Sequence, residues 1–230
     1  MPPLRVGGFV PLSATDYPDV LAAVVFCQGC PWRCRYCHNP HLLAPRNAAE
    51  ISWTVIRRFL EGRQGLLDAV VFSGGEPTLQ LGLAAAMQEV RALGMRVGLH
   101  TAGAYPRRLA QLLPLLDWVG LDYKASHASY ARITGLRGSG ERVRESAKLL
   151  LASGVAHEFR MTVHPALLSV EEIGAATREL AALGARTFVL QAFRPQGCAD
   201  ASLRVGGEAF DPRLLKDLAG LFPFFELRRA

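Results

Sequence analysis

Features of membrane and secreted proteins are scarce in this sequence. No apolar run approaches the roughly 18 residues of a membrane span. Residues 1–16 lack the charged segment and apolar core of a signal peptide. There are five cysteines, an odd number, and four of them lie within one short stretch, so a disulfide framework is not expected. We therefore expect a reduced, cytoplasmic protein with no membrane partner.

Clustered basic charge is also missing, although the chain is basic overall. Its formal net charge of +6 invites a nucleic-acid interpretation. The arginines are scattered over predicted helices, however, and no basic run of five or more residues occurs. We expect no nucleic-acid partner, and the charge suits an anionic cofactor or an acidic partner surface.

The chain alternates between apolar strand-like runs and helical patterns. Half of its 230 residues are apolar, enough for one sizeable domain. Strands are predicted at 21–26, 69–72, 96–101, 118–121, 158–163 and 186–191. Helices are predicted at 52–63, 79–93, from 106, at 141–152, 169–183 and 212–221.

Six strand–helix units predict a parallel sheet with helices packed on it. Because there are six units and not eight, we expect an α/β fold of the open, partial (βα)6 barrel type. The barrel core covers about 20–195 of a single domain, 1–230. Residues 4–19 form a leading extended segment or hairpin, and the C-terminal extension, about 211–228, adds the final helix and a possible edge strand.

A cysteine-rich loop follows the first strand of the predicted barrel. Cys30, Cys34 and Cys37 have the spacing C-x3-C-x2-C, with Tyr36 before the third. Three thiolates hold three corners of an iron–sulfur cluster; a cubane normally takes four, so one iron stays open to a ligand. The alternative is a zinc site with Cys27 as fourth ligand. Zinc sites usually draw ligand pairs from two separated loops, and no second pair exists, so the cluster is favoured.

The two other cysteines have different expected roles. We expect Cys27, at the end of a strand, to be a small buried residue and not a ligand. Cys198 stands alone in a later loop and is expected to be inert.

With these residues the chain resembles the radical S-adenosylmethionine enzymes, and within them the activating enzymes of glycyl radical proteins. It is most similar to the activating protein of anaerobic ribonucleoside-triphosphate reductase. The resemblance runs from Gly8 to about Arg194 and rests on four segments: Gln28-Gly29-Cys30, Cys34 to Pro40, Ser73-Gly74-Gly75-Glu76-Pro77 and Leu121-Asp122-Tyr123-Lys124.

The resemblance implies two cofactors, one 4Fe–4S cluster and S-adenosylmethionine. It implies that the cluster ligands are Cys30, Cys34 and Cys37. It implies that S-adenosylmethionine is bound by Tyr36, Cys37, His38, Gly74, Gly75, Glu76, Thr101, Asp122, Lys124 and Arg194, with Glu76 fixing its loop. The expected catalytic residues are Asp122, Lys124 and Arg160. Asp122 and Lys124, after the fourth strand, are implied to contact the cofactor and the site of hydrogen abstraction, and Arg160, along the fifth strand, matches an arginine that could hold a carboxylate bidentately.

Several of these residues could also have a purely structural role. Gly74-Gly75-Glu76 alone would read as a plain turn between strand and helix. Asp122 and Lys124, which we expect at the rim and not in the core, could form a surface ion pair. Two positions also depart from the family pattern: His100 stands where the family often has an acid that belongs to a monovalent-cation site, and Arg194 where some relatives carry a histidine over the adenosine.

The implied function is the installation of a glycyl radical on a partner protein, with flavodoxin or ferredoxin as electron donor. One alternative keeps the cofactors but takes a small-molecule substrate, as the 7-carboxy-7-deazaguanine synthases do. Another is a non-catalytic iron–sulfur or zinc protein that binds a partner.

Overall fold

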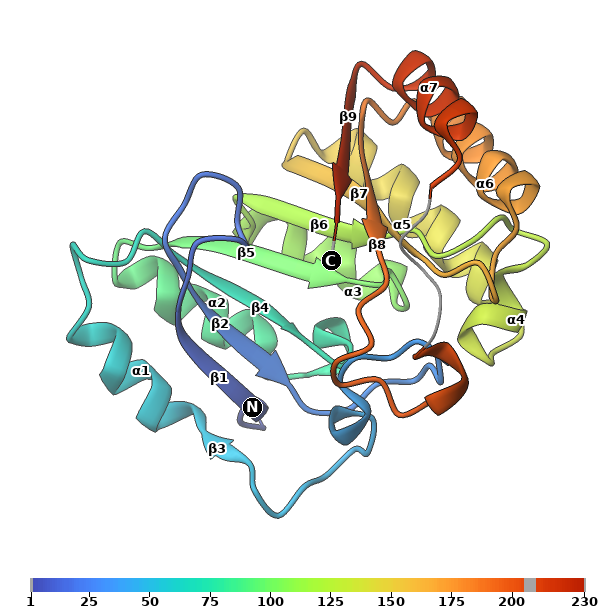
Figure 1. The fold of residues 1–230 in the computed structure, drawn as a ribbon. Helices are drawn as coiled ribbons and strands as arrows, with labels where there is room; N and C mark the ends of the chain where they lie inside the picture. Colours follow the sequence, from blue (N-terminus) through green and yellow to red (C-terminus); the bar gives the residue numbers. More distant parts are fainter. Residues whose placement is uncertain (1, 205–209, 230) are drawn as a thin grey trace.

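A nine-stranded sheet forms the centre of the molecule in the computed structural model, which describes residues 2–204 and 210–229 (Figure 1). Its spatial order is β3-β1-β2-β4-β5-β6-β7-β8-β9. The strands are β1 (Arg5–Ser13), β2 (Ala22–Cys27), β3 (Ile51–Ser52), β4 (Ala69–Gly74), β5 (Arg96–Thr101), β6 (Trp118–Asp122), β7 (Ala156–Val163), β8 (Thr187–Ala192) and β9 (Phe224–Arg228).

The sheet is parallel from β2 to β9, which confirms the predicted fold class. The predicted leading extended segment is β1, a single strand that runs antiparallel to β2, with the two-residue β3 beside it. The predicted edge strand is β9, parallel to β8. Among the described residues no pairing joins β9 to β1 or β3, so the barrel stays open on that side.

The helices pack along the outer face of the curved sheet (Figure 1). They are α1 (Trp53–Glu61), α2 (Leu83–Ala92), α3 (Pro106–Leu112), α4 (Tyr130–Thr134), α5 (Ser139–Ser153), α6 (Val170–Ala182) and α7 (Pro212–Leu221). The expected helix start at Pro106 and the capping box of Ser169 and Glu172 are both present.

Two local expectations were wrong. The helix predicted from Leu79 begins only at Leu83, because Pro77–Leu79 form a separate 3-10 turn in which the Glu76 side chain accepts a hydrogen bond from the Thr78 amide. The stretch between the strand predicted at 118–121 and the helix predicted at 141–152, to which no element was assigned, contains the short helix α4.

A small second core fills the concave face near the amino ends of the strands. Tyr17 and Val20, from the β1–β2 connection, pack there against Trp118 and the first residues of β2 and β4. The Tyr17 and Trp118 rings lie 5.2 Å apart. A Cβ on Gly98 would lie 3.0 Å from the Tyr17 ring, so glycine makes room for this plug. The amino end of the barrel is therefore filled, and the carboxyl ends of the strands are left for chemistry.

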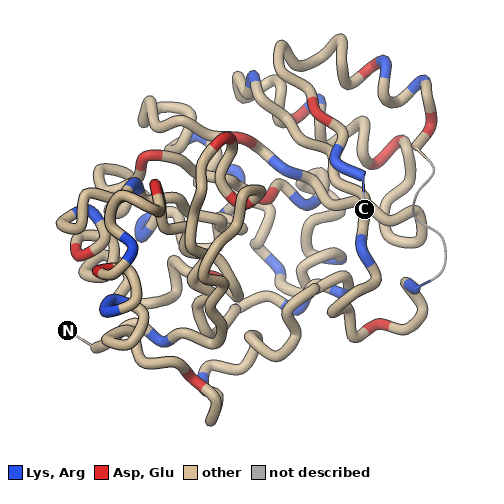
Figure 2. The backbone as a smooth tube through the Cα atoms, turned by 60° about the vertical axis from the view of Figure 1, so that its left-hand side comes forward, with Lys and Arg blue, Asp and Glu red and all other residues tan. Residues whose placement is uncertain are grey.

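Charges of both signs are interspersed along the chain (Figure 2). Among residues 2–204 and 210–229, no helix is long and apolar enough to cross a bilayer.

Candidate active site

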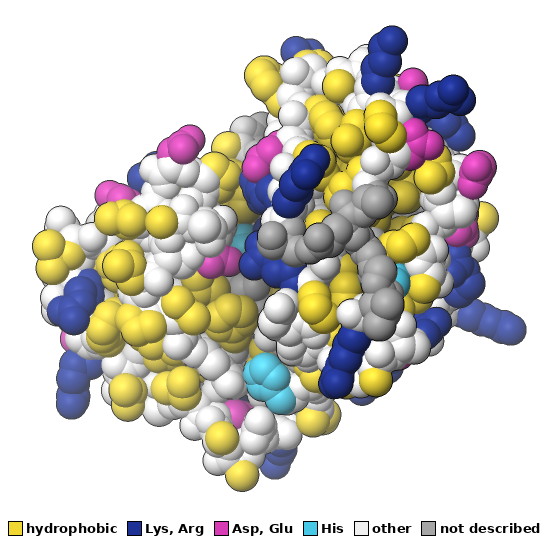
Figure 3. Space-filling view, in the orientation of Figure 1, with side chains coloured by type: hydrophobic (Ala, Val, Ile, Leu, Met, Phe, Trp, Pro, Cys, Tyr) yellow, Lys and Arg dark blue, Asp and Glu magenta, His cyan; other side chains and the backbone are white. Residues whose placement is uncertain are grey.

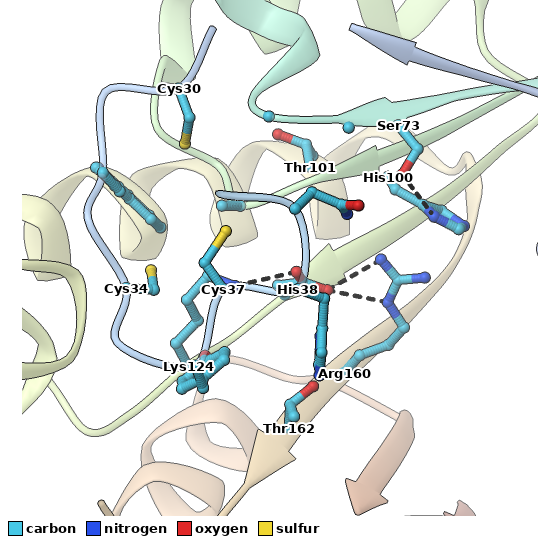
Figure 4. A pocket seen from close by; sticks show the side chains of 17 residues that line it. Cys30, Cys34, Cys37, His38, Ser73, His100, Thr101, Lys124, Arg160 and Thr162 are labelled. Carbon is cyan, nitrogen blue, oxygen red and sulfur yellow. Dashed lines mark hydrogen bonds and ion pairs between the residues drawn. The ribbon is translucent and has the colours of Figure 1, made fainter. Parts of the chain in front are cut away.

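A cavity lies at the carboxyl ends of the strands, beneath the cysteine loop (Figure 4). It brings together residues from five segments that are far apart in the sequence. Its walls include Cys30, Trp32, Cys34, Tyr36, Cys37, His38, Asn39, Ser73, Gly74, Gly75, His100, Thr101, Ala102, Asp122, Lys124, Arg160 and Thr162. Most of the residues predicted for the site therefore face one space.

Backbone hydrogen bonds fix the shape of the cysteine loop. The Gly29 amide donates to the Leu42 carbonyl at 2.8 Å, and the Cys37 amide donates to the Cys34 carbonyl at 3.1 Å. Gln28 is fully buried, and its Nε2 donates to the Ala44 carbonyl at 2.7 Å. These bonds hold the half-buried thiols of the loop against the cavity.

The donor set fits a cluster better than a single metal ion. Zinc needs all its ligands about 2.0–2.3 Å from one point, whereas a cubane gives each cysteine its own iron. Within the described ranges no three His, Cys, Asp or Glu side chains converge on one such point. Cys27, the fourth ligand of the zinc alternative, is fully buried in the main core, as expected.

Two further features of the loop concern what the cavity can bind. Burial raises the pKa of the Cys30 thiol to about 12 and also raises those of Cys34 and Cys37, so binding of iron must displace protons. The Tyr36 hydroxyl and the Trp32 Nε1 are buried without a hydrogen-bond partner among the described residues. Buried polar groups are normally satisfied, and both residues line the cavity.

The Gly74-Gly75 turn packs against the cysteine loop. Gly74 has a φ of 111°, and a Cβ there would lie 2.4 Å from the Cys27 nitrogen. A Cβ on Gly75 would lie 2.3 Å from the Gly29 carbonyl oxygen. The neighbouring protein backbone therefore requires glycine at both positions, whether or not a ligand also contacts them.

Glu76 lies behind the cavity wall and holds two segments together. Its carboxylate accepts hydrogen bonds from the Thr78 amide at 3.0 Å, the Thr101 hydroxyl at 2.7 Å and the Ala102 amide at 2.9 Å. Burial raises the pKa of Glu76, against the effect of these bonds. Any contribution of Glu76 to cofactor binding is therefore indirect, through the turn after β4 and the end of β5.

Asp122 bridges two buried cations. Its Oδ2 lies 3.1 Å from Lys124 Nζ and its Oδ1 lies 2.9 Å from Arg160 Nη2. Lys124 is 9% and Arg160 8% exposed, so the surface-ion-pair alternative was wrong. Lys124 lines the cavity at the strand ends, as the expected rim position implies, but its side chain is buried there. Gly120 makes room for the guanidinium, since a Cβ there would lie 2.8 Å from Arg160 Cζ.

The charge of this triad faces the cavity. Burial alone would raise the pKa of Asp122, but Lys124 and Arg160 outweigh it and hold that pKa well below its usual value. With the carboxylate ionised, two cations and one anion leave one net positive charge. That charge complements a carboxylate ligand.

His100 is a neutral side chain at the position where the family often has an acidic one. Its Nε2 lies 2.8 Å from the Asp16 carbonyl oxygen, which can only accept, so Nε2 is the protonated nitrogen. Its Nδ1 then accepts from the Ser73 hydroxyl at 3.3 Å. Burial lowers the pKa of His100 to about 3, with Arg160 acting in the same direction, so the ring is neutral.

Arg194 lies outside the walls of the cavity. Its carbonyl oxygen lies 2.8 Å from His38 Nε2, and the His38 ring stacks on Phe193 with centroids 5.2 Å apart. Arg194 lines an adjoining depression with Gln191 and Arg228. Arg194 therefore adjoins the cavity through its main chain.

Some residues that line the cavity or pack on the cysteine loop were not predicted from the sequence. Thr162 follows Arg160 by two residues on β7, so the period of a strand would have placed it on the same face. Cys198, treated as isolated, is buried, and its thiol donates to the Arg35 carbonyl at 3.4 Å. Arg35 also pairs with Asp200 at 2.8 Å. No local signal shows that this late segment packs on the cysteine loop.

The family model of the Radical SAM superfamily matches residues 24–167. This chain belongs to that superfamily. The matched range includes the three-cysteine loop and the strands β4 to β7, whose ends form the cavity. The protein is a radical S-adenosylmethionine enzyme, and its cofactors are a 4Fe–4S cluster and S-adenosylmethionine.

The proteins similar in sequence to this chain are named as activating enzymes and as a peptide cyclase. A Methanocaldococcus jannaschii protein, named as a glycyl-radical enzyme activating enzyme, is 31% identical over 73% of this chain and 72% of its own. The pyruvate formate-lyase-activating enzyme of Streptococcus mutans is 30% identical over 70% of this chain and 65% of its own. The PqqA peptide cyclase of Gluconobacter oxydans is 34% identical over 66% of this chain, but this covers only 44% of the cyclase.

Solved structures agree on the fold. Streptococcus suis SuiB bound to S-adenosylmethionine matches with a TM-score of 0.66 and 14% identity, over 92% of this chain and 52% of SuiB. QueE from Escherichia coli matches with a TM-score of 0.55 and 19% identity, over 82% of this chain and 84% of QueE. The chain thus spans about half of SuiB and most of QueE.

Proposed function

We propose that this radical S-adenosylmethionine enzyme installs a glycyl radical on a partner protein, and that the partner is an anaerobic ribonucleoside-triphosphate reductase. The observation that carries the proposal is the joint placement of a three-cysteine loop and a net positive triad in one cavity. The names of two relatives support the class of partner. The match to a peptide cyclase shows why the partner itself has to be tested.

Cys30, Cys34 and Cys37 are the proposed cluster ligands, which leaves the fourth iron for S-adenosylmethionine. When bound, the cluster would supply one electron, taken from a flavodoxin or ferredoxin, for the reductive cleavage of S-adenosylmethionine to methionine and 5′-deoxyadenosine, whose new hydrogen atom would come from the partner's glycine. The protein supplies binding, orientation and exclusion of water.

The triad has a binding role in this proposal. Lys124 and Arg160 supply the net positive charge for the carboxylate of S-adenosylmethionine, and Asp122 holds both cations in place. Because Lys124 and Arg160 are buried and paired, little rearrangement is needed when the ligand binds.

The remaining walls supply main-chain and aromatic contacts. Gly74 and Gly75 offer backbone groups that no side chain covers, while Tyr36, His38 and Thr101 border the rest of the ligand. We propose that the enzyme works in the reducing cytoplasm as a single domain.

The test starts with anaerobically reconstituted protein, dithionite and S-adenosylmethionine. We expect 5′-deoxyadenosine from the wild type and none from Cys34→Ala. Addition of purified anaerobic ribonucleoside-triphosphate reductase should then give a glycyl-radical EPR signal, and the same partner with its radical glycine replaced by alanine should give none. A signal with pyruvate formate-lyase alone would contradict the proposed partner.

Other results would identify the alternatives. Formation of 5′-deoxyadenosine without a radical on any partner, together with conversion of a small heterocycle, would identify a small-molecule enzyme of the 7-carboxy-7-deazaguanine synthase kind. Absence of 5′-deoxyadenosine from cluster-loaded protein would identify a binding protein without this activity.

A further inference from the structure

A late segment of the chain packs on the cysteine loop. It consists of residues 193–204, which follow β8 and include the 3-10 turn Ala201–Leu203, and we call it the strap. Figure 1 shows the strap beside the loop that leads from β2 to β3. The match to the family model ends at residue 167, so the strap lies outside the part of the chain that the family model describes.

The first part of the strap is fixed to His38, the residue after Cys37. The Phe193 ring stacks on the His38 ring with centroids 5.2 Å apart, and the Arg194 carbonyl oxygen lies 2.8 Å from His38 Nε2. Gly197 then packs on the main chain of His38. Its φ is 82°, and a Cβ there would lie 2.4 Å from the His38 carbonyl oxygen. A side chain at position 197 would therefore force the strap away from the loop.

The second part of the strap is fixed to Arg35, which lies between two of the proposed cluster ligands. The buried Cys198 thiol donates to the Arg35 carbonyl at 3.4 Å. The Arg35 guanidinium donates to Asp200 Oδ2 at 2.9 Å and to Ser202 Oγ at 3.2 Å. Leu203, buried in the main core, anchors the end of the strap.

The cysteine loop has little internal support of its own. Residues 28–39, all of which the structure describes, form neither a helix nor a strand. Cys34 and Cys37 are only partly buried. In the space-filling view the molecule is hollowed between the side that carries β1 and α1 and the side that carries α6 and α7 (Figure 3). Irregular, partly exposed segments open locally at low cost in free energy unless tertiary contacts hold them.

We propose that the strap positions Cys34 and Cys37 for the cluster and limits the access of small solutes to it. Every contact described above reaches Arg35 or His38, each adjacent in sequence to one of these two ligands, so a displacement of the strap displaces the ligands. The strap residues are positioning residues, because they act through the loop. The inference rests on the proposed ligand set and holds whatever substrate the enzyme takes.

Gly197→Ala tests the contact of the strap with His38. Its matched control is Gly94→Ala, where φ is a similar 77° but no described atom beyond the chain neighbours lies within 4 Å of the added Cβ. Both proteins are loaded with the cluster anaerobically and mixed with EDTA, and the loss of the visible cluster absorption is followed. Gly197→Ala should lose iron about tenfold faster than the control, which corresponds to about 1.4 kcal/mol of lost packing.

A second pair of variants tests the contact with Arg35. Arg35→Gln removes the ion pair with Asp200, and the control, Arg57→Gln, removes the exposed pair that Arg57 makes with Glu61 on α1. Because the Arg35 side chain is half exposed, iron loss should accelerate less, by about threefold. The control should lose iron at the wild-type rate.

Thermal unfolding of the cluster-free proteins separates positioning from general stability. Each variant should melt with its control, because the buried Cys198 and Leu203 still hold the strap to the core. Rates of iron loss equal to those of the controls in both Gly197→Ala and Arg35→Gln would overturn the inference, whatever the melting temperatures. A cluster that persists in Cys34→Ala would overturn it together with the proposed ligand set. Absence of a radical on any partner would overturn only the proposed function.

Discussion

Asp122 is the residue whose removal should cost the most among the charges of the cavity. It is the one carboxylate within ion-pair distance of Lys124 and Arg160 among the described residues. Asp122→Ala would leave two largely buried cations unpaired. Breaking a buried pair in this way typically costs about 3–5 kcal/mol, whereas an exposed pair contributes about 1 kcal/mol or less.

The magnitude should lie between these limits. The Asp122 side chain is 35% exposed toward the cavity, so water would partly solvate the cations left behind. We expect a loss of about 2 kcal/mol. For a chain of this length that corresponds to a fall in Tm of about 4–8 °C.

The assay is thermal unfolding of cluster-free protein at neutral pH, followed by circular dichroism. The matched control, Asp217→Ala, changes an exposed aspartate of α7 and should stay within about 0.5 kcal/mol of wild type. Adding Lys124→Met to Asp122→Ala should recover part of the loss, because one stranded cation is removed. An Asp122→Ala protein that melts like the control would refute the bridging role, and the triad would then be worth no more than a surface ion pair.

Three further predictions concern the cluster, the glycine turn and pH. Alanine at any one of the three motif cysteines should abolish the visible iron–sulfur absorption and the reduced-cluster EPR signal, and Cys27→Ala should keep both; loss of the cluster in Cys27→Ala would change the ligand set. Gly75→Ala should lower cluster occupancy as well as affinity for S-adenosylmethionine, because its Cβ would lie 2.3 Å from the Gly29 carbonyl oxygen. Gly220→Ala, where nothing lies within 4 Å, is its control, and an intact cluster in Gly75→Ala would contradict the packing argument. The pKa of His100 is lowered to about 3 in the folded protein, so the ring stays neutral there, whereas in the unfolded chain it takes up a proton below about pH 6.5. The free energy of unfolding should therefore fall on acidification, by up to about 1.4 kcal/mol per pH unit. Tm measured from pH 7 to pH 4 should decline less steeply in His100→Phe, and parallel profiles would disprove this.

Short-range features of the sequence were enough to determine the order of elements and the cluster motif. The spacing C-x3-C-x2-C is a property of the covalent chain, so it can be recognised whatever the tertiary structure is. Helix starts at Pro106 and at the Ser169 capping box follow from backbone sterics and bonds within a few residues. Alternating apolar runs then left a parallel sheet as the consistent packing.

Tertiary structure alone decided what each site residue touches. Asp122 meets Arg160, 38 residues away, because β6 and β7 are neighbours in register and Gly120 leaves space between them. Glu76 is held by the end of β5, and the Cys198 thiol reaches the Arg35 carbonyl across 163 residues. The sequence shows which residues can carry charge or donate hydrogen bonds. Which of them are buried together depends on strand order and side-chain direction, because a contact between distant residues leaves no local pattern in the chain.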